Sequence, residues 1–247
     1  MSVIVGTSGW QYDDWRDELY GTTPKTRWLE AFAQRLRAVE VNNTFYRLPS
    51  AETFASWRDR TPDGFVFAIK ASRFITHVRR LEDVSEPVTV LIERASALAR
   101  KLGPVLYQLP PSLRRDDALL ARFLDALPPY PKAAIEFRHD SWINEAVFSV
   151  MRERDVALCV AHADPSGSPV PVTASWAYFR LHGGPGYRQY TPEENEAIAR
   201  VVAGVAATVD PVFVFFDNDT GGAAVRDAQT LTANLAVTGV DGRDEVR

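Results

Sequence analysis

Short apolar runs, rich in β-branched and aromatic residues, recur eight times along the chain, and loops or amphipathic segments separate them. Runs of this length and composition are typical of buried strands. They cover residues 3–8, 38–46, 64–70, 103–110, 132–139, 156–162, 176–183 and 211–219. Strands that alternate with helices favour a parallel sheet. We therefore predict an α/β fold, a single (β/α)8 barrel of the TIM type.

A length of 247 residues suits one such barrel, and the composition does not change along the chain. We predict one domain over residues 1–236 and a flexible polar tail over residues 237–247. The stretch "ADPSGSPVPVTAS" at 163–175 is too rich in Pro, Gly and Ser for an ordinary helix, so the sixth β/α unit should be degenerate. An open doubly wound sheet is disfavoured because no Gly-rich phosphate motif follows the first run.

The charge balance limits the partners. A formal net charge of −4 argues against a general binder of nucleic acid or of an anionic membrane. The single cysteine, Cys159, lies in an apolar run and cannot form an intrachain disulfide. The chain starts without a signal-peptide pattern, and no apolar run approaches the roughly 20 residues that span a bilayer. We predict a cytoplasmic protein with a small-molecule ligand; nothing indicates its oligomeric state.

Polar residues gather towards the C-terminal ends of the predicted strands. Because side chains alternate along a strand, Glu40 and Asn42 share one face of the second run, and Glu136 and Arg138 share one face of the fifth. The other predicted polar positions near strand ends are Lys70, His77, Gln108, His139, Arg180, His182 and Asn218. Barrel enzymes carry their active sites at this end. We therefore predict a polar pocket at the C-terminal face.

The charges predicted to point inward do not balance. Three are cations, Lys70, Arg138 and Arg180, and two are carboxylates, Glu40 and Glu136. Isolated charges are costly inside a protein, so we expect ion pairs such as Glu40–Arg180 or Glu136–Lys70. The remaining cation predicts a ligand with a phosphate or carboxylate group. Three aspartates would cancel this surplus if their side chains point inward: Asp164, Asp217 and Asp219.

Two buried carboxylates permit acid/base chemistry if one of their pKa values is raised. Glu40 and Glu136 are the catalytic candidates, and Trp10 and Tyr46 are candidate walls of the pocket. Carboxylates and histidines on several strand ends also permit a metal site, but no H-E-x-x-H motif or cysteine pair supports one. We predict no metal and no cofactor. A purely structural network of salt bridges would use the same residues.

Six longer motifs occur in an order and spacing that resemble one family. They are "GTSGWQYDDW", "VEVNNTFYRLP", "WRDRTPDGFVFAIKASRFITH", "LGPVLYQLPPS", "AIEFRHDSW" and "YFRLHG". The chain resembles the domain-of-unknown-function 72 (YecE-like) proteins from about Val3 to the last predicted helix. The resemblance implies a TIM-type barrel and leaves the activity open.

The resemblance also implies which positions belong to the motifs of the family. They are Gly9, Trp10, Glu40, Asn42, Phe45, Tyr46, Lys70, Thr76, His77, Gln108, Glu136, Arg138, Trp142, Arg180, His182, Gly183, Phe216 and Asn218. The chain departs from the pattern at two places. Asp217 stands where these proteins usually have Asn, and Leu19-Tyr20-Gly21 replaces an aromatic-Tyr-Pro segment. Asp217 adds a carboxylate near the predicted pocket and weakens the argument for an anion there.

We predict an enzyme, a hydrolase or a lyase/isomerase, that acts by acid/base chemistry on a small polar, anionic substrate. Two alternatives remain open. One is a metabolite-binding protein without catalysis, and the other is a metal-dependent hydrolase of phosphoesters or nucleic acid.

Overall fold

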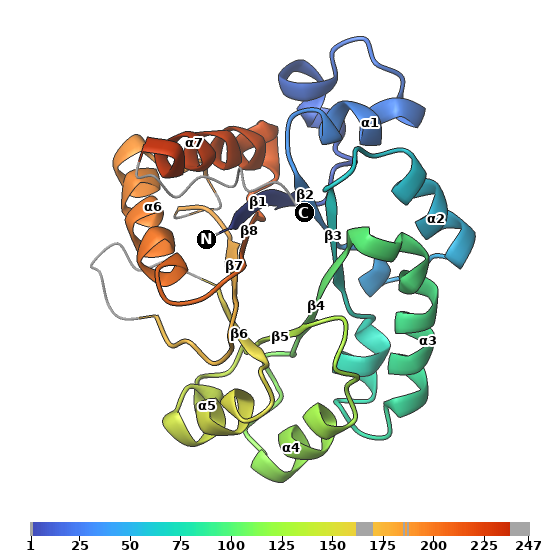
Figure 1. Cartoon of the computed structure of the whole chain (residues 1–247), viewed down its shortest axis with the longest axis vertical. Helices are drawn as coiled ribbons and strands as arrows, with labels where there is room; N and C mark the ends of the chain where they lie inside the picture. Colours follow the sequence, from blue (N-terminus) through green and yellow to red (C-terminus); the bar gives the residue numbers. More distant parts are fainter. Residues whose placement is uncertain (1, 162–169, 185, 187, 238–247) are drawn as a thin grey trace.

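The computed structural model describes residues 2–161, 170–184, 186 and 188–237. Eight parallel strands form a closed barrel in chain order (Figure 1). They are β1 (Val3–Ser8), β2 (Ala38–Val41), β3 (Val66–Lys70), β4 (Leu102–Gln108), β5 (Ala133–Glu136), β6 (Ala157–Val160), β7 (Ala177–Leu181) and β8 (Val212–Phe216). Each strand lies within one residue of a predicted run, so the predicted (β/α)8 barrel is confirmed.

Helices surround the barrel and cover the outer faces of its strands (Figure 1). They are α1 (Trp28–Ala33), α2 (Ala51–Asp59), α3 (Ser85–Ala95), α4 (Asp117–Asp125), α5 (Glu145–Arg152), α6 (Pro192–Ala206) and α7 (Ala223–Val237). Helix α6 begins at a capping box in which Thr191 and Glu194 each bond the backbone of the other. No helix of the described residues has the length and apolar character to cross a membrane.

The sixth β/α unit is irregular, as predicted. Of the residues described between β6 and β7, which are 161 and 170–176, none is helical. At the end of the chain, α7 includes Val237, which the sequence assigned to the tail. The rest of the predicted tail, 238–247, lies outside the described residues.

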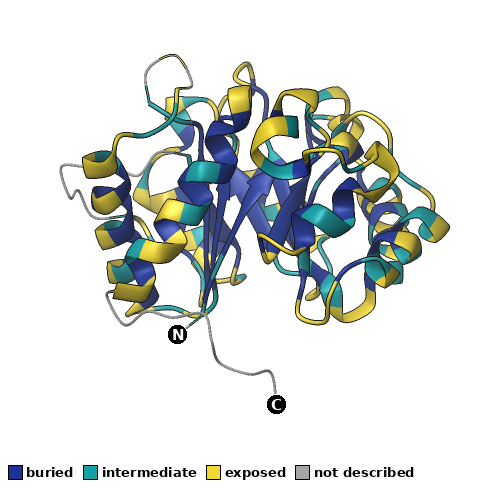
Figure 2. Ribbon diagram, turned by 90° about the horizontal axis from the view of Figure 1, so that it is seen from above, coloured by how far each residue is buried: buried dark blue, intermediate teal, exposed yellow. Residues whose placement is uncertain are grey.

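The strands present two different faces. Val39 and Val41 belong to the large apolar core between the barrel and its helices, whereas Ala38 belongs to a second cluster. The members of this second cluster lie inside the barrel: Ala38, Ala68, Leu106, Ala134, Ala157, Cys159, Trp176, Tyr178, Phe213 and Phe215. The strands are buried, and exposed residues lie on the outer helices and loops (Figure 2). The predicted alternation along the strands is therefore correct.

Candidate functional site

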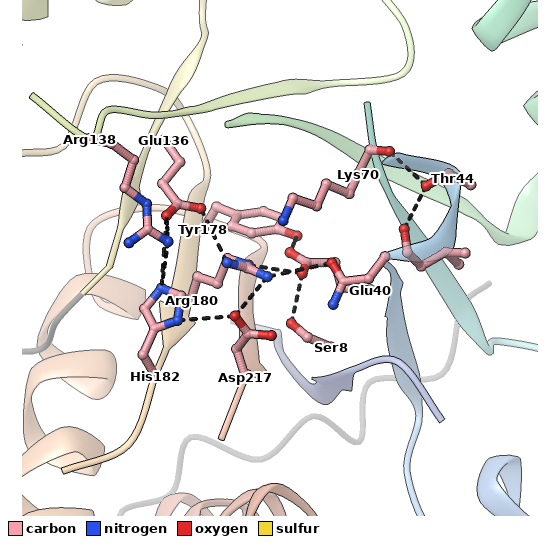
Figure 3. Close-up of polar contacts among 12 residues, drawn as sticks. Ser8, Glu40, Thr44, Lys70, Glu136, Arg138, Tyr178, Arg180, His182 and Asp217 are labelled. Atoms are coloured by element: carbon pink, nitrogen blue, oxygen red, sulfur yellow. Dashed lines mark hydrogen bonds and ion pairs between the residues drawn. The ribbon is translucent and has the colours of Figure 1, made fainter. Parts of the chain in front are cut away.

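Glu40, on β2, is fully buried at the centre of a polar cluster (Figure 3). Its carboxylate accepts hydrogen bonds from Ser8 Oγ at 2.7 Å and from the Tyr178 hydroxyl at 2.6 Å. Arg180 Nε donates a third at 2.9 Å and forms an ion pair. Three donors offset much of the cost of burying a charge. The predicted Glu40–Arg180 pair is confirmed, and it crosses the barrel because β2 and β7 are not neighbours.

Arg180 joins the carboxylates of three strands or strand ends. Besides Glu40, its Nη2 lies 2.8 Å from Asp217 Oδ2, and its Nη1 lies 3.5 Å from Glu136 Oε2. Nη2 also donates to Asn42 Oδ1 at 3.4 Å. Burial by itself would lower the pKa of Arg180, but the three carboxylates raise it well above its ordinary value. Arg180 is therefore the charged centre of the cluster.

Glu136 ends β5 and is also fully buried. It forms ion pairs with Arg138 and Arg180, and its Oε1 lies 3.8 Å from His182 Nε2. Burial favours the neutral acid, but His182 and the two arginines outweigh it and lower the pKa of Glu136. Glu136 is therefore ionised at neutral pH. The expected Glu136–Lys70 pair is not formed; Arg138 and Arg180 take that place.

His182, directly after β7, lies between this carboxylate and a second one. Its Nδ1 is 3.0 Å from Asp217 Oδ2, and its Nε2 is 3.2 Å from Arg138 Nη2. Burial lowers the pKa of His182, but its hydrogen bonds to Asp217 and Glu136 outweigh burial and raise it. The pKa of Asp217 is lowered, since His182 and Arg180 overcome the effect of burial. The histidine and the aspartate thus stabilise each other as an ion pair.

The inward position of Asp217 changes the charge balance. Asp217 continues the inward face of β8 that carries Phe213 and Phe215. Three carboxylates therefore face the three cations Lys70, Arg138 and Arg180, and the predicted surplus of one cation is cancelled before His182 is counted. A favoured anion can no longer be inferred from the net charge. A preference for an anionic ligand would depend on where the individual cations lie.

Lys70, the last residue of β3, is half-buried and points into the cluster (Figure 3). Among the described residues it forms no ion pair; its Nζ lies 4.8 Å from the centre of the Phe45 ring. Thr44 Oγ1 bonds the carbonyl oxygens of Val41 and Lys70 at 2.7 and 2.6 Å, and so connects β2 to β3 at this end. Burial, and next the charge of Arg180, lower the pKa of Lys70.

Asp219 is a further carboxyl group near the same end of the barrel. Its Oδ1 is buried and has no hydrogen-bond partner among the described residues. Burial and the charge of Asp217 raise the pKa of Asp219 to about 7. Its backbone carbonyl accepts a hydrogen bond from Trp15 Nε1 at 2.6 Å, which fixes the loop after β8. The two aspartates thus differ in protonation near neutral pH.

Two residues of the predicted site serve other parts of the fold. Asn218 does not face the cluster: its Nδ2 donates to Asp227 Oδ2 on α7 at 2.7 Å and to the Arg188 carbonyl at 3.3 Å. Asn218 therefore lies apart from the cluster and binds α7, and its role in orienting a substrate stays a prediction. Trp10 is only 3% exposed and packs edge-on against Trp57, so its indole belongs to the core.

The remaining predicted residues lie around the cluster. His139 Nδ1 accepts from the Ser141 backbone and so caps the turn after β5. Phe45 contacts the rings of both His77 and Tyr46, and Tyr46 is 76% exposed. Gln108 ends β4 with its Oε1 buried and unpaired among the described residues. For these positions ligand binding stays a prediction. Asp164, one of the three aspartates considered for the charge balance, lies outside the described residues.

Four residues of the cluster were not among the predicted site residues, namely Ser8, Tyr178, Asp217 and Asp219, although the two aspartates were considered as carboxylates that would point inward. Alternation could have found two of them. Tyr178 shares a face with Arg180, and Asp217 shares a face with Phe213 and Phe215. No local signal distinguished Ser8, because its role depends on its register with Glu40 on β2.

Metal binding finds no support in the described part of the chain, where no group of three or more His, Cys, Asp or Glu residues is arranged to hold an ion. The predicted pocket stays a prediction. A surface cavity of about 290 Å³ lies instead beside α3, where Phe74, Pro87 and Leu91 line it. It shares no residue with the ionic cluster.

Residues 4–245 match the family model described as protein of unknown function DUF72. The chain belongs to the DUF72 family. It is 33% identical to the UPF0759 protein YecE of Escherichia coli K12 over 138 residues, which are 56% of this chain and 48% of YecE. The chain thus spans about half the length of this curated relative in the match. The UPF0759 protein YunF of Bacillus subtilis is 22% identical over 95% of both chains.

A crystal structure of a DUF72 family protein from Thermotoga maritima has the same fold. Its TM-score is 0.84 at 26% identity, and the match covers 96% of this chain and 100% of the other. The family and the barrel are therefore established together, whereas the substrate and the chemistry are not.

Proposed function

We propose that this DUF72 protein is an enzyme that performs acid/base chemistry on a small polar substrate with an anionic group, at the C-terminal end of the barrel. One observation carries the proposal. His182 is held at Nδ1 by Asp217, and its Nε2 faces Glu136 and Arg138. A carboxylate that orients one imidazole nitrogen directs the other towards its partner in proton transfer, which here is the side of the ring that faces Glu136.

The direction of the pKa shift of His182 supports its proposed role in proton transfer. An unperturbed histidine has a pKa of about 6.5, and the hydrogen bonds of His182 to Asp217 and Glu136 raise its pKa above that value, which favours the protonated imidazole. Glu136 is ionised and adjacent, but its pKa is lowered rather than raised as the sequence argument required, so it is a weaker base than His182. Glu40, the other carboxylate predicted to be catalytic, is fully buried and accepts three hydrogen bonds. Its proposed role is to position Arg180.

The position of the cations supports an anionic group on the substrate. The side chain of Arg138 is 32% exposed, whereas those of Glu136 and Arg180 are 0% and 3% exposed. Lys70 is half-buried, and no carboxylate pairs with it among the described residues. Cations therefore lie on the accessible side of the cluster, where a guanidinium can hold a phosphate or carboxylate by two hydrogen bonds. The unpaired Gln108 Oε1 would accept from a substrate hydroxyl.

Binding is tested by thermal shift with phosphate, sugar phosphates and small carboxylic acids. A ligand at 100 times its dissociation constant adds about 2.7 kcal/mol, or roughly 5–10 °C for a chain of this size. The shift should disappear in Arg138→Ala. The matched control is Arg115→Ala, because the Arg115 side chain is 35% exposed and pairs with Asp117 rather than with a residue of the cluster. A shift that survives Arg138→Ala, or no shift with any anion, would overturn the anion site.

Catalysis is tested with the anion that binds, by mass spectrometry of the products. His182→Gln and Glu136→Gln should abolish turnover while the thermal shift persists. Turnover that is unchanged in both variants would rule out the proposed acid/base pair. Binding without turnover in the wild type would identify a metabolite-binding protein.

A further inference from the structure

The chain has four lysines, at positions 25, 70, 101 and 132, and three of them have their ammonium groups bonded to oxygen. Lys25 pairs with Asp13 at 2.6 Å, and Lys132 pairs with Asp155 at 3.1 Å. Lys101 Nζ donates to two backbone carbonyls, each at 2.6 Å. Lys70 differs, because its Nζ lies over the Phe45 ring and has no oxygen partner among the described residues.

The surroundings of Lys70 lower its pKa, so its neutral amine is more available than that of an exposed lysine. Its pKa is lowered by burial and then by the charge of Arg180 from β7. The carboxylates that face it, which act in the opposite direction, come from β2, β5 and the end of β8: Glu40, Glu136 and Asp217. From the turn after β3, His77 also senses its charge. A desolvated lysine beside another cation is a stronger nucleophile than an exposed lysine, and such lysines form Schiff bases with carbonyl substrates.

Lys70 is also accessible. It is half-buried, and its side chain extends from the strand end towards Tyr178 and Glu40 (Figure 3). The Phe45 ring lies against the amine itself, with Nζ 4.8 Å from the ring centre, so the amine is held in place without an ion pair. The amine, the His182 imidazole and the Glu136 carboxylate all lie at the same end of the barrel, where the strands end.

We propose that Lys70 forms a Schiff base with an aldehyde or ketone group of the substrate. This inference rests on the proposed function and names its substrate class, a carbonyl compound with a phosphate or carboxylate group. The Lys70 nitrogen adds to the carbonyl carbon, and one of its protons moves to the carbonyl oxygen to give a carbinolamine. The C–O bond then breaks, and the hydroxyl leaves as water with the second nitrogen proton, so that a C=N bond forms. No oxidant or reductant is required.

The Schiff base explains why an acid/base group should lie beside this lysine. When the imine takes up a proton, it withdraws electrons from the neighbouring carbon, so a base can remove a proton there or a carbon–carbon bond can break. His182 and Glu136 are the bases of the cluster. This chemistry belongs to lyases and isomerases rather than to hydrolases.

Reductive trapping tests the inference. The full chain is incubated separately with glyoxylate, pyruvate and glyceraldehyde 3-phosphate as probes, and cyanoborohydride reduces any imine to a stable amine. Peptide mapping by mass spectrometry then locates the adduct. We expect at least one probe to modify Lys70 more than Lys25 or Lys132 near neutral pH, since burial and the charge of Arg180 lower the pKa of Lys70 and so increase the fraction of its neutral amine.

Two variants and one comparison decide the outcome. Lys70→Arg should lose the adduct and keep its thermal unfolding transition, whereas the control Lys101→Arg should keep the adduct. Equal modification of all accessible lysines, or no Lys70 adduct with any probe, would overturn the Schiff base. If the adduct is absent but the Arg138-dependent thermal shift remains, the inference fails while the proposed function stands.

Discussion

The interior of the barrel has an apolar layer and an ionic layer, and several of the same strands contribute to both. In β7, Tyr178 lies in the apolar layer and Arg180 two residues later lies in the ionic one. In β8, Phe215 is followed on the same face by Asp217. The apolar layer is held mainly by packing, with the Tyr178 hydroxyl bonded to Glu40 at its upper edge, whereas the ionic layer depends on each charge having its partner.

This contrast indicates what each layer is for. A buried ion pair is weak evidence for stability, because the cost of desolvation can exceed the Coulombic gain. An apolar filling of the ionic layer would serve stability at least as well. The ionic layer also lies at the end of the barrel where active sites are found. We infer that it is maintained for function, and that the apolar layer supports it from below.

The largest expected effect is in the ionic layer. Arg180→Met leaves the buried Glu40 and Glu136 without their shared cation, so we expect a loss of about 3–5 kcal/mol in the free energy of unfolding. The control is Arg138→Met. Because the Arg138 side chain is about one third exposed, this variant should lose about 1 kcal/mol or less in the free energy of unfolding. Urea unfolding followed by circular dichroism near pH 7 measures both values.

This difference should depend on pH. The pKa values of Glu136 and Asp217 are lowered in the folded state, so their contribution is present above the unfolded pKa values of about 4. It is lost as the pH falls through the folded values. Equal losses for the two arginine variants near neutral pH would contradict the view that Arg180 sustains the layer.

A second effect is expected at Asp219, where a carboxyl group has an unpaired oxygen. Its folded pKa of about 7 exceeds its ordinary 3.8, so the folded state binds the proton more tightly and stability falls as the pH rises between these values. Asp219→Asn removes this penalty. We expect the variant to be more stable than the wild type near pH 8 by about 2–4 kcal/mol, with little difference near pH 4.

Thermal unfolding across this pH range measures the effect. A variant whose advantage over the wild type does not change with pH would show that Asp219 is not protonated in the folded chain.

The smallest effect is expected in the apolar layer. Cys159 is 5% exposed and lies among apolar side chains. In Cys159→Ser the hydroxyl would therefore be buried without a hydrogen-bond partner on a neighbouring side chain. We expect Cys159→Ser to be less stable than the control Cys159→Ala by about 1 kcal/mol, which corresponds to roughly 2–4 °C in Tm. A serine variant as stable as the alanine one would show that this layer accepts polar groups.

The sequence by itself determined the number and order of the strands, and the face of each strand that carries polar atoms. Both follow from local rules, because apolar runs mark strands and alternation assigns their faces. Alternation also predicted the Glu40–Arg180 ion pair, because it made both side chains point into the same narrow barrel. The capping box at Thr191 is likewise a local pattern.

Only the tertiary structure decided which charges meet. Lys70 was expected to pair with Glu136, but the guanidinium groups of Arg138 and Arg180 lie closer to that carboxylate. Asn218 was assigned to the site and its neighbour Asp217 was not, although Asp217 is the residue that binds His182. Partner choice depends on the stagger of distant strands and on the reach of each side chain. Those distances are fixed when the barrel closes, and no local pattern in the sequence contains them.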